Sequence, residues 1–403
     1  MELRCGFKRT DAGVIPEEWE ALSIRELEAK KALRLFRGLV ISKKDMAREP
    51  GDYPVYSSSV HNNGLFGRYG RYMFDEELIT WSIDGGGNFF YRPKHRFSVT
   101  NVCGYMRVDS STLDCRFTSY QLQHLHGRQA FDYTLKAHPS VIRGIYVVPL
   151  PPLPEQRVIA GALEDVDAVL GALTQLIAKK RDLKQAAMQQ LLTGQTRLSG
   201  FSGGWRVLSM AENSTLNARI GWQGLTTAEY LPTGEYYLVT GTDFLAGRVN
   251  WASCCFVDAS RYVQDKKIQL KVRDILLTKD GTIGKVGFVD SLPGPATLNS
   301  GVFVIRPRGA AYDPLFFYYI LASRVFDDFL VQLQAGSTIS HLYQKDFVNF
   351  SFLAPDVPEQ TAIAAALSGM DAELAALEQR LAKTCLIKQG MMQELLTGRT
   401  RIV

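Results

Sequence analysis

The sequence lacks the features that mark membrane-embedded and secreted proteins. None of its apolar runs approaches the ~18–20 residues that a transmembrane helix needs. The first residues, MELRCGFKRTDAG, contain no apolar segment that resembles a signal peptide. The six cysteines include no Cys-x-x-Cys pair and have no histidine at zinc-ligand spacing. These absences predict a reduced, cytoplasmic protein with structural cysteines, no membrane partner and no metal site.

Motifs of catalysis are also missing. There is no Asn/Asp-Pro-Pro-aromatic motif of a base-directed methyltransferase, no Walker A sequence, and no Gly-x-Gly-x-x-Gly turn between a strand and a helix. The run from Glu28 to Lys30 matches only the last part of a Mg²⁺-dependent nuclease motif, and its stretch RELEAKK is typical of a solvated helix face. His124 and His126 have no acidic or cysteine partner at ligand spacing. We therefore expect no catalytic residue and no cofactor in this chain.

Composition and charge leave the class of partner open. Apolar residues at 46% and charged residues at 22% are ordinary for a globular protein, and 403 residues suffice for two or three domains. The formal charge of +5 and the pI of about 8.7 permit a nucleic-acid partner without demonstrating one.

The most informative feature of the sequence is a long internal repeat. Residues 154–198 begin with Pro-Glu-Gln and contain Leu-Leu-Thr-Gly at 191–194. Adding 204 to each residue number gives the second copy at 358–402, with the same two motifs and no gap. A repeat of this length at one fixed offset indicates a duplicated architecture.

Each copy is predicted to form one long helix, because its apolar residues recur with the 4-3-4-3-4 spacing of a coiled-coil seam. These residues are Ile159, Leu163, Val166, Leu170, Leu173 and Ile177 in the first copy and Ile363, Leu367, Met370, Leu374, Leu377 and Leu381 in the second. About 38 residues would make a rod of roughly 57 Å. Because the apolar stripe is narrow, each helix needs one partner, and we expect an antiparallel coiled coil of the two copies. Two unrelated amphipathic helices are the weaker alternative.

The segments between the repeats are faintly similar to each other. GDYPVYS (51–57) resembles GEYYLVT (234–240), and ITWSIDGGGN (79–88) resembles LLTKDGTIGK (276–285), in which a strand enters an Asp-Gly turn. The chain is thus predicted to be a tandem duplication with pseudo-twofold character. It would have two mixed α/β (α+β) globular domains, 1–150 and 199–354, and two helical segments, 151–198 and 355–403.

Several motifs connect this organisation to a known family. PLPPLPEQRVIA bounds the first predicted helix at its start, LLTGQTRL bounds it at its end, and IPEEW stands at 15–19. With these motifs the chain closely resembles, over essentially its full length, the specificity subunits of Type I restriction-modification enzymes. RIGWQGLT (219–226), DILLTKDGTIGKVG (274–287) and GSTISHLYQKDF (336–347) resemble target-recognition segments of that family. In the first domain, AHPSVIRGI (137–145) is placed where GSTISHL would stand.

The resemblance implies a non-catalytic DNA-recognition subunit. Each α/β domain would be a target-recognition domain that enters the major groove over one half of a bipartite site, and the helices would set the unread spacer. The implied partners are double-stranded DNA, two methyltransferase subunits and restriction subunits. S-adenosylmethionine, ATP and Mg²⁺ would belong to those partner subunits.

Aromatic, amide and basic residues cluster in predicted loops of both domains, and such mixtures suit a surface that holds phosphates and reads base edges. The best phosphate-binding candidate is Gly336-Ser337-Thr338, because small side chains leave backbone N–H groups accessible. The predicted DNA-binding residues are Tyr56, Ser57, Ser58, His61, Asn62, Trp81, Asp84, Asn88 and Lys94 in the first domain, and Arg219, Trp222, Gln223, Thr240, Lys279, Lys285, Ser337, Thr338 and His341 in the second.

Other functions remain compatible with the sequence. One is an assembly or scaffold protein whose helices bind partners, for which affinity would hardly change with salt. Another is an enzyme whose motif is not evident. The partner system could also be a related one in which methylation and cleavage share one polypeptide.

Overall fold

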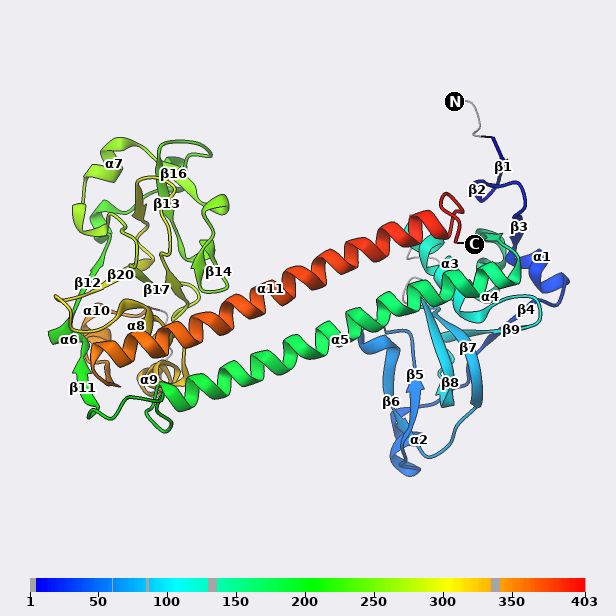
Figure 1. Cartoon of the computed structure of the whole chain (residues 1–403), viewed down its shortest axis with the longest axis horizontal. Helices are drawn as coiled ribbons and strands as arrows, with labels where there is room; N and C mark the ends of the chain where they lie inside the picture. The colour runs from blue at the N-terminus through cyan, green and yellow to red at the C-terminus, as the bar shows by residue number, and fades with distance from the viewer. Residues whose placement is uncertain (1–4, 60, 85–86, 130–135, 335–340, 403) are drawn as a thin grey trace. The chain divides into compact units, whose positions relative to one another are not determined.

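The computed structural model describes residues 5–59, 61–84, 87–129, 136–334 and 341–402, without the side chains of Trp222 and Gln334. The chain folds into two compact units (Figure 1). Unit 1 comprises Met1–Gln175 and Gln379–Val403, and unit 2 comprises Leu176–Glu378. Each unit therefore combines one α/β domain with a part of both helical repeats.

Unit 1 is built on a mixed six-stranded sheet with the strand order β4-β9-β7-β8-β5-β6. Neighbouring strands are antiparallel except for β5 and β8, which are parallel. The strands are β4 (Leu33–Arg37), β5 (Tyr53–Tyr56), β6 (Leu65–Tyr69), β7 (Phe74–Ser82), β8 (Phe89–Val99) and β9 (Cys103–Val108), beside the pairs β1 (Phe7–Thr10) with β2 (Gly13–Pro16) and β3 (Glu20–Ser23) with β10 (Val147–Leu150). The helices are α1 (Ile24–Ala29), α2 (Lys43–Arg48), α3 (Cys115–Gly127) and α4 (Pro139–Ile145), with the 3-10 helix η1 (His61–Gly64).

Helix α3 and the first long helix cover the core of unit 1. The Asp114 side chain caps α3 by accepting a hydrogen bond from the Phe117 amide at 2.8 Å. The buried face of α3 contributes Phe117 to the same apolar cluster as Trp81 of the sheet and Ile159 of the long helix. Sheet and helices therefore form one core.

Unit 2 contains a six-stranded sheet, β12-β20-β17-β18-β15-β14, and a three-stranded sheet, β16-β13-β19. The strands are β11 (Arg206–Ser209), β12 (Ser214–Ala218), β13 (Tyr236–Val239), β14 (Phe244–Leu245), β15 (Arg248–Val249), β16 (Cys255–Val257), β17 (Ile275–Thr278), β18 (Val286–Phe288), β19 (Ala296–Leu298), β20 (Val302–Pro307) and β21 (Ser351–Ala354). The short helices are α6 (Met210–Asn213), α7 (Ala259–Val263), α8 (Pro314–Leu321), α9 (Arg324–Gln334) and α10 (Gln344–Phe347), with η2 (Gly221–Gln223), η3 (Thr227–Glu229), η4 (Gly241–Asp243), η5 (Trp251–Ser253) and η6 (Lys266–Ile268). Helices α8, α9 and α10 gather around the start of the second long helix (Figure 1).

The two units repeat the same arrangement at the end of one parallel strand pair. In unit 1 the Thr100 amide donates to the Tyr56 carbonyl at 2.9 Å, and in unit 2 the Asn299 amide donates to the Val239 carbonyl at 3.1 Å. Ser57 and Thr240, the next residues along the chain, are therefore equivalent. This matches the predicted similarity of 51–57 to 234–240.

The predicted alignment of 79–88 with 276–285 is displaced by one residue. The Ser82 amide donates to the Asn88 carbonyl at 3.1 Å, and the Thr278 amide donates to the Lys285 carbonyl at 3.0 Å. These bonds make Ser82, rather than Trp81, the equivalent of Thr278. The sequence comparison missed this shift because the turn of unit 1 has one residue fewer.

A second correction concerns AHPSVIRGI. The Ala137 amide donates to the Ile83 carbonyl at 2.8 Å, and the Leu342 amide donates to the Lys279 carbonyl at 2.8 Å. Residues 137–145 are thus equivalent to 342–350 rather than to GSTISHL, and α4 is equivalent to α10. The predicted equivalence was wrong because the backbone bonds of Ala137 and Leu342, which the sequence does not show, decide which residues correspond.

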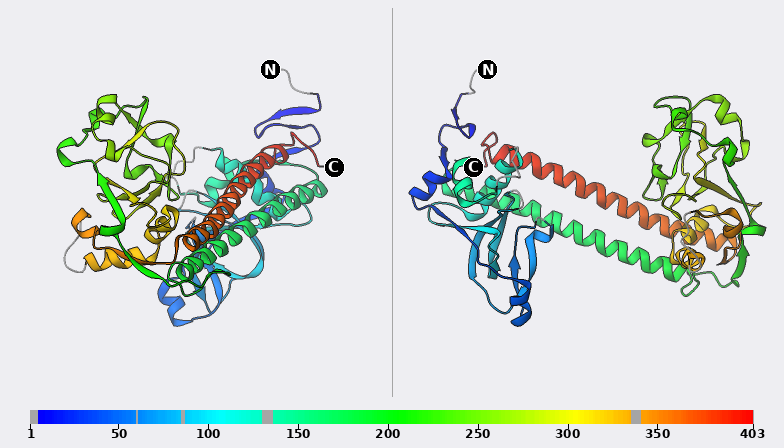
Figure 2. Two further views of the ribbon diagram at one scale, coloured as in Figure 1. Left: turned by 60° about the vertical axis from the view of Figure 1, so that its left-hand side comes forward. Right: turned by 180° about the vertical axis from the view of Figure 1, so that it is seen from behind.

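The two long helices are α5 (Leu153–Leu191) and α11 (Val357–Leu395), each with 39 residues. The predicted mixed α/β fold, with two repeated domains and long helices, is confirmed. Segments of α5 and α11 lie side by side in each unit, as both further views agree (Figure 2). None of the twelve predicted seam residues is exposed. Within the described residues no helix has the length and apolarity needed to span a bilayer.

Ion pairs between α5 and α11 recur at the offset of 204 residues that relates the two repeats. In unit 2 Lys184 pairs with Asp371, and in unit 1 Lys388 pairs with Asp167 at 2.6 Å. Adding 204 to Lys184 gives Lys388, and adding 204 to Asp167 gives Asp371. Each repeat therefore supplies the cation for one unit and the carboxylate for the other. In unit 2 Lys180 pairs with Glu373 and Lys184 pairs with Asp371, so the two helix segments run antiparallel there.

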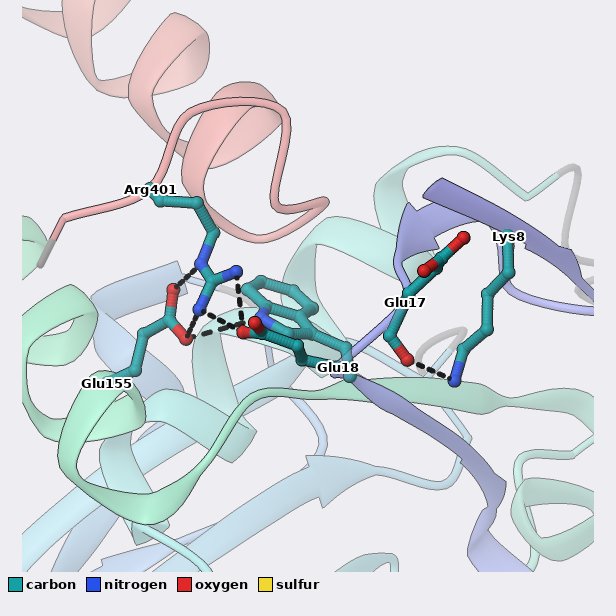
Figure 3. A network of polar contacts seen from close by, with 6 residues as sticks. Lys8, Glu17, Glu18, Glu155 and Arg401 are labelled. Atoms are coloured by element: carbon teal, nitrogen blue, oxygen red, sulfur yellow. Dashed lines mark hydrogen bonds and ion pairs between the residues drawn. The ribbon is translucent and has the colours of Figure 1, made fainter. Parts of the chain in front are cut away.

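The ends of the helices follow the same rule. Arg401 donates to Glu155 at 2.9 Å and to Glu18 at 3.1 Å in unit 1 (Figure 3). Its counterpart Arg197 donates to Glu359 at 2.5 and 2.6 Å in unit 2. Hydrogen bonding to the buried Glu155 raises the pKa of Arg401. The last residues of the chain thus complete the fold around its first strands.

We predict that Arg401→Met lowers the free energy of unfolding of unit 1 by roughly 2–3 kcal/mol, because it leaves the buried Glu155 carboxylate without its cation. The matched control is Arg399→Met, which removes a half-exposed cation 3.9 Å from Glu394 and should cost about 0.5 kcal/mol or less. Urea unfolding followed by tryptophan fluorescence measures both, since the Trp19 indole also donates to Glu155, at 3.2 Å. Equal losses in the two variants would contradict the prediction.

Candidate nucleic-acid interface

Polar groups of unit 1 meet where β5 and β7 end. The Ser57 amide donates to the Gly64 carbonyl at 2.8 Å, and the Thr100 hydroxyl donates to the Ser57 hydroxyl at 3.0 Å. The Ser82 hydroxyl donates to the Ser58 carbonyl at 2.7 Å. Ser57, Ser58, residues 61–64, Asn88 and Thr100 together are called the polar rim of unit 1.

A buried arginine lies beneath this rim. Arg92 is 4% exposed, and its guanidinium lies 3.7 Å from the centre of the Tyr56 ring. It donates to the Thr80 hydroxyl at 2.9 Å and to the Asn63 carbonyl at 2.7 Å. Burial lowers the pKa of Arg92. Because these partners are all neutral, the guanidinium charge adds positive potential under the loop that holds Asn63.

The exposed side chains of the rim point to solvent above this charge. His61 and Asn62 are exposed, and Asn62 has a φ of 49°, a left-handed conformation that asparagine tolerates. Asn88 is half-buried, and Lys94, on β8 and outside the polar rim as defined, is exposed. These groups can donate to phosphates or to base edges.

Trp81 was predicted to bind DNA, and the structure contradicts this. Its side chain is fully buried, and the indole N–H donates to the Ala137 carbonyl at 2.7 Å. The ring lies against Gly104, where a Cβ would come within 2.2 Å of it. Trp81 is a core residue that connects the sheet to the segment before α4.

Unit 2 has an equivalent polar rim, formed by Thr240, Lys279, Lys285, Asn299 and His341. The Lys285 ammonium donates to the Gly241 carbonyl at 3.2 Å, and the Lys279 amide donates to the Gly301 carbonyl at 2.9 Å. Lys279 and Lys285 are both half-exposed, so their charges remain accessible. Four separate chain segments therefore place two cations, two hydrogen-bonding side chains and an imidazole at one place.

An ion pair crosses each rim at the same position. Asp84 pairs with Lys136 at 3.2 Å in unit 1, and Asp280 pairs with His341 in unit 2. The registers of β7 and β17 make Asp84 and Asp280 equivalent, and the bonds of Ala137 and Leu342 make Lys136 and His341 equivalent. Lys136 therefore neutralises Asp84, and His341 occupies the equivalent place beside Asp280.

Two further predicted residues of unit 2 are buried. Arg219 is 1% exposed and donates to the Leu298 carbonyl at 2.9 Å and to the Thr297 hydroxyl at 3.3 Å. Gln223 is 6% exposed. Direct base contact by either side chain is incompatible with this burial. Ser337, Thr338 and the side chain of Trp222 lie outside the described residues.

Sequence reasoning did not select Thr100 and Asn299 of the rims, nor the neighbouring residues Arg92, Lys136 and Asp280, as site residues. Thr100 and Asn299 could have been found, because each occupies nearly the same place in the similar segments TNVCGYMRV and LNSGVFVIR. The partners of the ion pairs are more than 50 residues apart in each unit, so no local spacing indicates them.

The rims carry groups whose chemistry suits nucleic-acid recognition. Cations and backbone N–H groups can hold phosphates, while amides, hydroxyls and imidazole can read base edges. Among the described residues no group of three or more His, Cys, Asp and Glu is placed to hold a metal ion.

Comparison with known proteins agrees with this chemistry. The model of the type I restriction modification DNA specificity domain matches the chain twice, over residues 16–184 and 225–384. The chain belongs to this family. Both matches contain one polar rim and a part of one long helix, so the duplication seen in the contacts is also a duplication of the family domain.

One specificity subunit and one solved structure match this chain over nearly the full length of both chains, and a further subunit matches it in part. The type I restriction enzyme MjaVIII specificity subunit of Methanocaldococcus jannaschii is 22% identical over 98% of this chain and 96% of its own. The MpnII specificity subunit of Mycoplasma pneumoniae is 28% identical over 39% of this chain and 48% of its own. The crystal structure of a type I restriction-modification S subunit from M. genitalium has a TM-score of 0.65 at 16% identity, covering 98% of both chains. At that identity the structural match establishes the fold alone.

We predict that Arg219→Met destabilises unit 2 by roughly 3 kcal/mol, because the buried Leu298 carbonyl and Thr297 hydroxyl lose their donor. The control Arg206→Met changes an exposed residue of β11 and should stay within about 0.5 kcal/mol of the original protein. Chemical unfolding distinguishes the two variants. An Arg219→Met protein of unchanged stability with weakened DNA binding would restore the original interpretation of Arg219 as a DNA contact.

Proposed function

We propose that the chain recognises a bipartite DNA target, with one half-site read by each polar rim, and directs methyltransferase and restriction subunits to it. The observation that carries the proposal is the equivalence of the two rims. Each lies at the end of an equivalent parallel strand pair, and in each an aspartate contacts a basic side chain from an equivalent segment, Asp84 with Lys136 and Asp280 with His341. Two equivalent rims on one chain suit two short sequences with an unread spacer between them.

The proposed readout divides the work between two kinds of contact. Lys94, Lys279 and Lys285 would bind phosphates and supply affinity that depends on salt. His61, Asn62, Thr240 and their neighbours would make the base-edge contacts that discriminate sequences. The chain itself would do no chemistry, and S-adenosylmethionine, ATP and Mg²⁺ would be bound by the partner subunits.

A groove in unit 2 supports the docking of a partner subunit. It has a volume of about 930 Å³ and lies among α5, α8, α9 and α11. Met188, Leu315, Val325 and Leu374 contribute apolar surface, while Lys184, Arg324, Asp327 and Glu378 bring charges of both signs. A groove lined by apolar side chains and by charges of both signs fits an amphipathic helix. We assign this groove to a methyltransferase subunit.

The salt dependence of binding to double-stranded DNA tests the proposal. Lys279→Gln and Lys285→Gln should each weaken binding to all sequences alike and reduce the slope of log K against log salt by about one, because each removes one phosphate contact. The control is Lys267→Gln. The Lys267 carbonyl accepts a hydrogen bond from Arg306, which lies near the end of β20 that is farther from the rim. An affinity that is insensitive to salt in the original protein would reject DNA recognition and favour a scaffold.

We also predict that Leu315→Asp prevents assembly with the methyltransferase subunit, because it places a charge on the apolar floor of the groove. Val331→Asp on α9 is the matched control, since Val331 is 63% exposed and does not line the groove. Size-exclusion chromatography of co-expressed subunits measures assembly. A stable complex with Leu315→Asp would remove this assignment of the groove.

A further inference from the structure

The contacts that give this family member its base specificity need not all be polar. We infer that Leu39 in unit 1 and Ile220 in unit 2 each contact the 5-methyl group of a thymine, and so determine one position in each half-site. The inference rests on the proposed recognition of DNA by the two rims. It adds apolar specificity residues to an interface otherwise made of hydrogen-bonding groups.

Both side chains are exposed aliphatic groups at the ends of equivalent strands. Leu39 is 60% exposed and Ile220 is 53% exposed. Strand β4 ends at Arg37, which is paired with Gly104, and β12 ends at Ala218, which is paired with Phe303. Leu39 and Ile220 each stand two residues beyond these ends.

The strand registers show that the two positions are equivalent. Gly104 follows by one residue Cys103, the partner of Ser82 on β7, and Phe303 follows by one residue Val302, the partner of Thr278 on β17. Since Ser82 and Thr278 are equivalent, the ends of β4 and β12 are equivalent as well. One exposed aliphatic residue at this place would need no explanation, but its recurrence in both units, in unlike sequences, does.

In unit 1 the backbone holds Leu39 against the rim. The Leu39 amide donates to the Val99 carbonyl at 3.2 Å, and Leu39 forms a parallel bridge with Thr100. Gly38 makes this approach possible, because a Cβ at that position would lie 2.3 Å from the Thr100 carbonyl oxygen. Thr100 in turn bonds to Ser57, so Leu39 borders the polar rim.

In unit 2 the Arg219 side chain takes the place of the backbone hydrogen bond between Leu39 and Val99. Arg219, which replaces Gly38, donates to the carbonyl of Leu298, the equivalent of Val99. The anchored Arg219 fixes the backbone just before Ile220, one residue from the point of attachment to the strand that leads to Asn299. This explains why Arg219 is buried at the rim although it cannot reach DNA itself.

In unit 1 the surroundings of Leu39 favour DNA over a protein partner. Exposed Arg37, Lys43 and Lys44 flank Leu39 and its exposed neighbour Val40, and such cations suit phosphates on either side of an apolar contact. The thymine 5-methyl group is the apolar feature that base pairs present in the major groove. An aliphatic side chain between phosphate-binding cations therefore matches an A·T pair.

The test measures coupling between each side chain and the thymine methyl group. The complex of this chain with its methyltransferase subunit is bound to duplexes carrying the genomic target, with each thymine replaced in turn by deoxyuridine. The original protein should bind one such duplex in each half-site roughly fourfold more weakly, as expected for one buried methyl group. Leu39→Ala should abolish the penalty in one half-site only, and Ile220→Ala in the other only.

Two exposed valines away from the rims serve as controls. Val14→Ala on β2 and Val207→Ala on β11, at residues 44% and 66% exposed, should keep both penalties. Penalties that persist in Leu39→Ala and Ile220→Ala would overturn the inference. So would a loss of subunit assembly in these variants without any change in the deoxyuridine penalties, since that identifies a protein contact. Binding that ignores sequence altogether in the original protein would instead reject the proposed function.

Discussion

The pairing of each helix-start glutamate with an arginine of the other repeat is the interaction on which the rest of the structure depends. Glu155 begins α5 but is neutralised by Arg401, and Glu359 begins α11 but is neutralised by Arg197. Because both carboxylates are buried, neither unit can close without a cation from the other copy. The lysine–aspartate pairs along the helices likewise join one residue of each repeat. The units are therefore completed by each other's repeats and cannot be assigned to the first and second halves of the chain.

This exchange explains why the two polar rims lie at equivalent places in their units. Each unit receives the same helical segments in the same register, so each α/β domain is held against an equivalent support. Gln156 and Gln360 illustrate this, since each accepts from the amide of an aspartate that caps a helix, Asp114 or Asp313, at 2.9 Å. The support can remain constant while the rims differ, as with Lys136 in one and His341 in the other. A duplicated scaffold with divergent rims suits the reading of two unlike half-sites.

The sequence predicted the scaffold well and the rims only in part. The seam of the long helices is a local pattern, so residues such as Leu163 and Leu367 could be identified from spacing alone. Trp81 and Arg219 were placed on the surface because indole and guanidinium groups suit DNA as well as a core, and only the packing around Gly104 and Leu298 distinguishes the two. The one-residue shift at Ser82, and ion pairs such as Asp280 with His341, depend on strand pairing that no single stretch of sequence encodes.

Mapping N6-methyladenine across a genome in cells that express this chain with its methyltransferase subunit tests the central claim most directly. Two equivalent rims on one chain predict a single bipartite motif, with two short sequences at a fixed distance and an unread gap between them. Methylation at one short continuous site would contradict the account. A stable complex that methylates no defined sequence would contradict it as well.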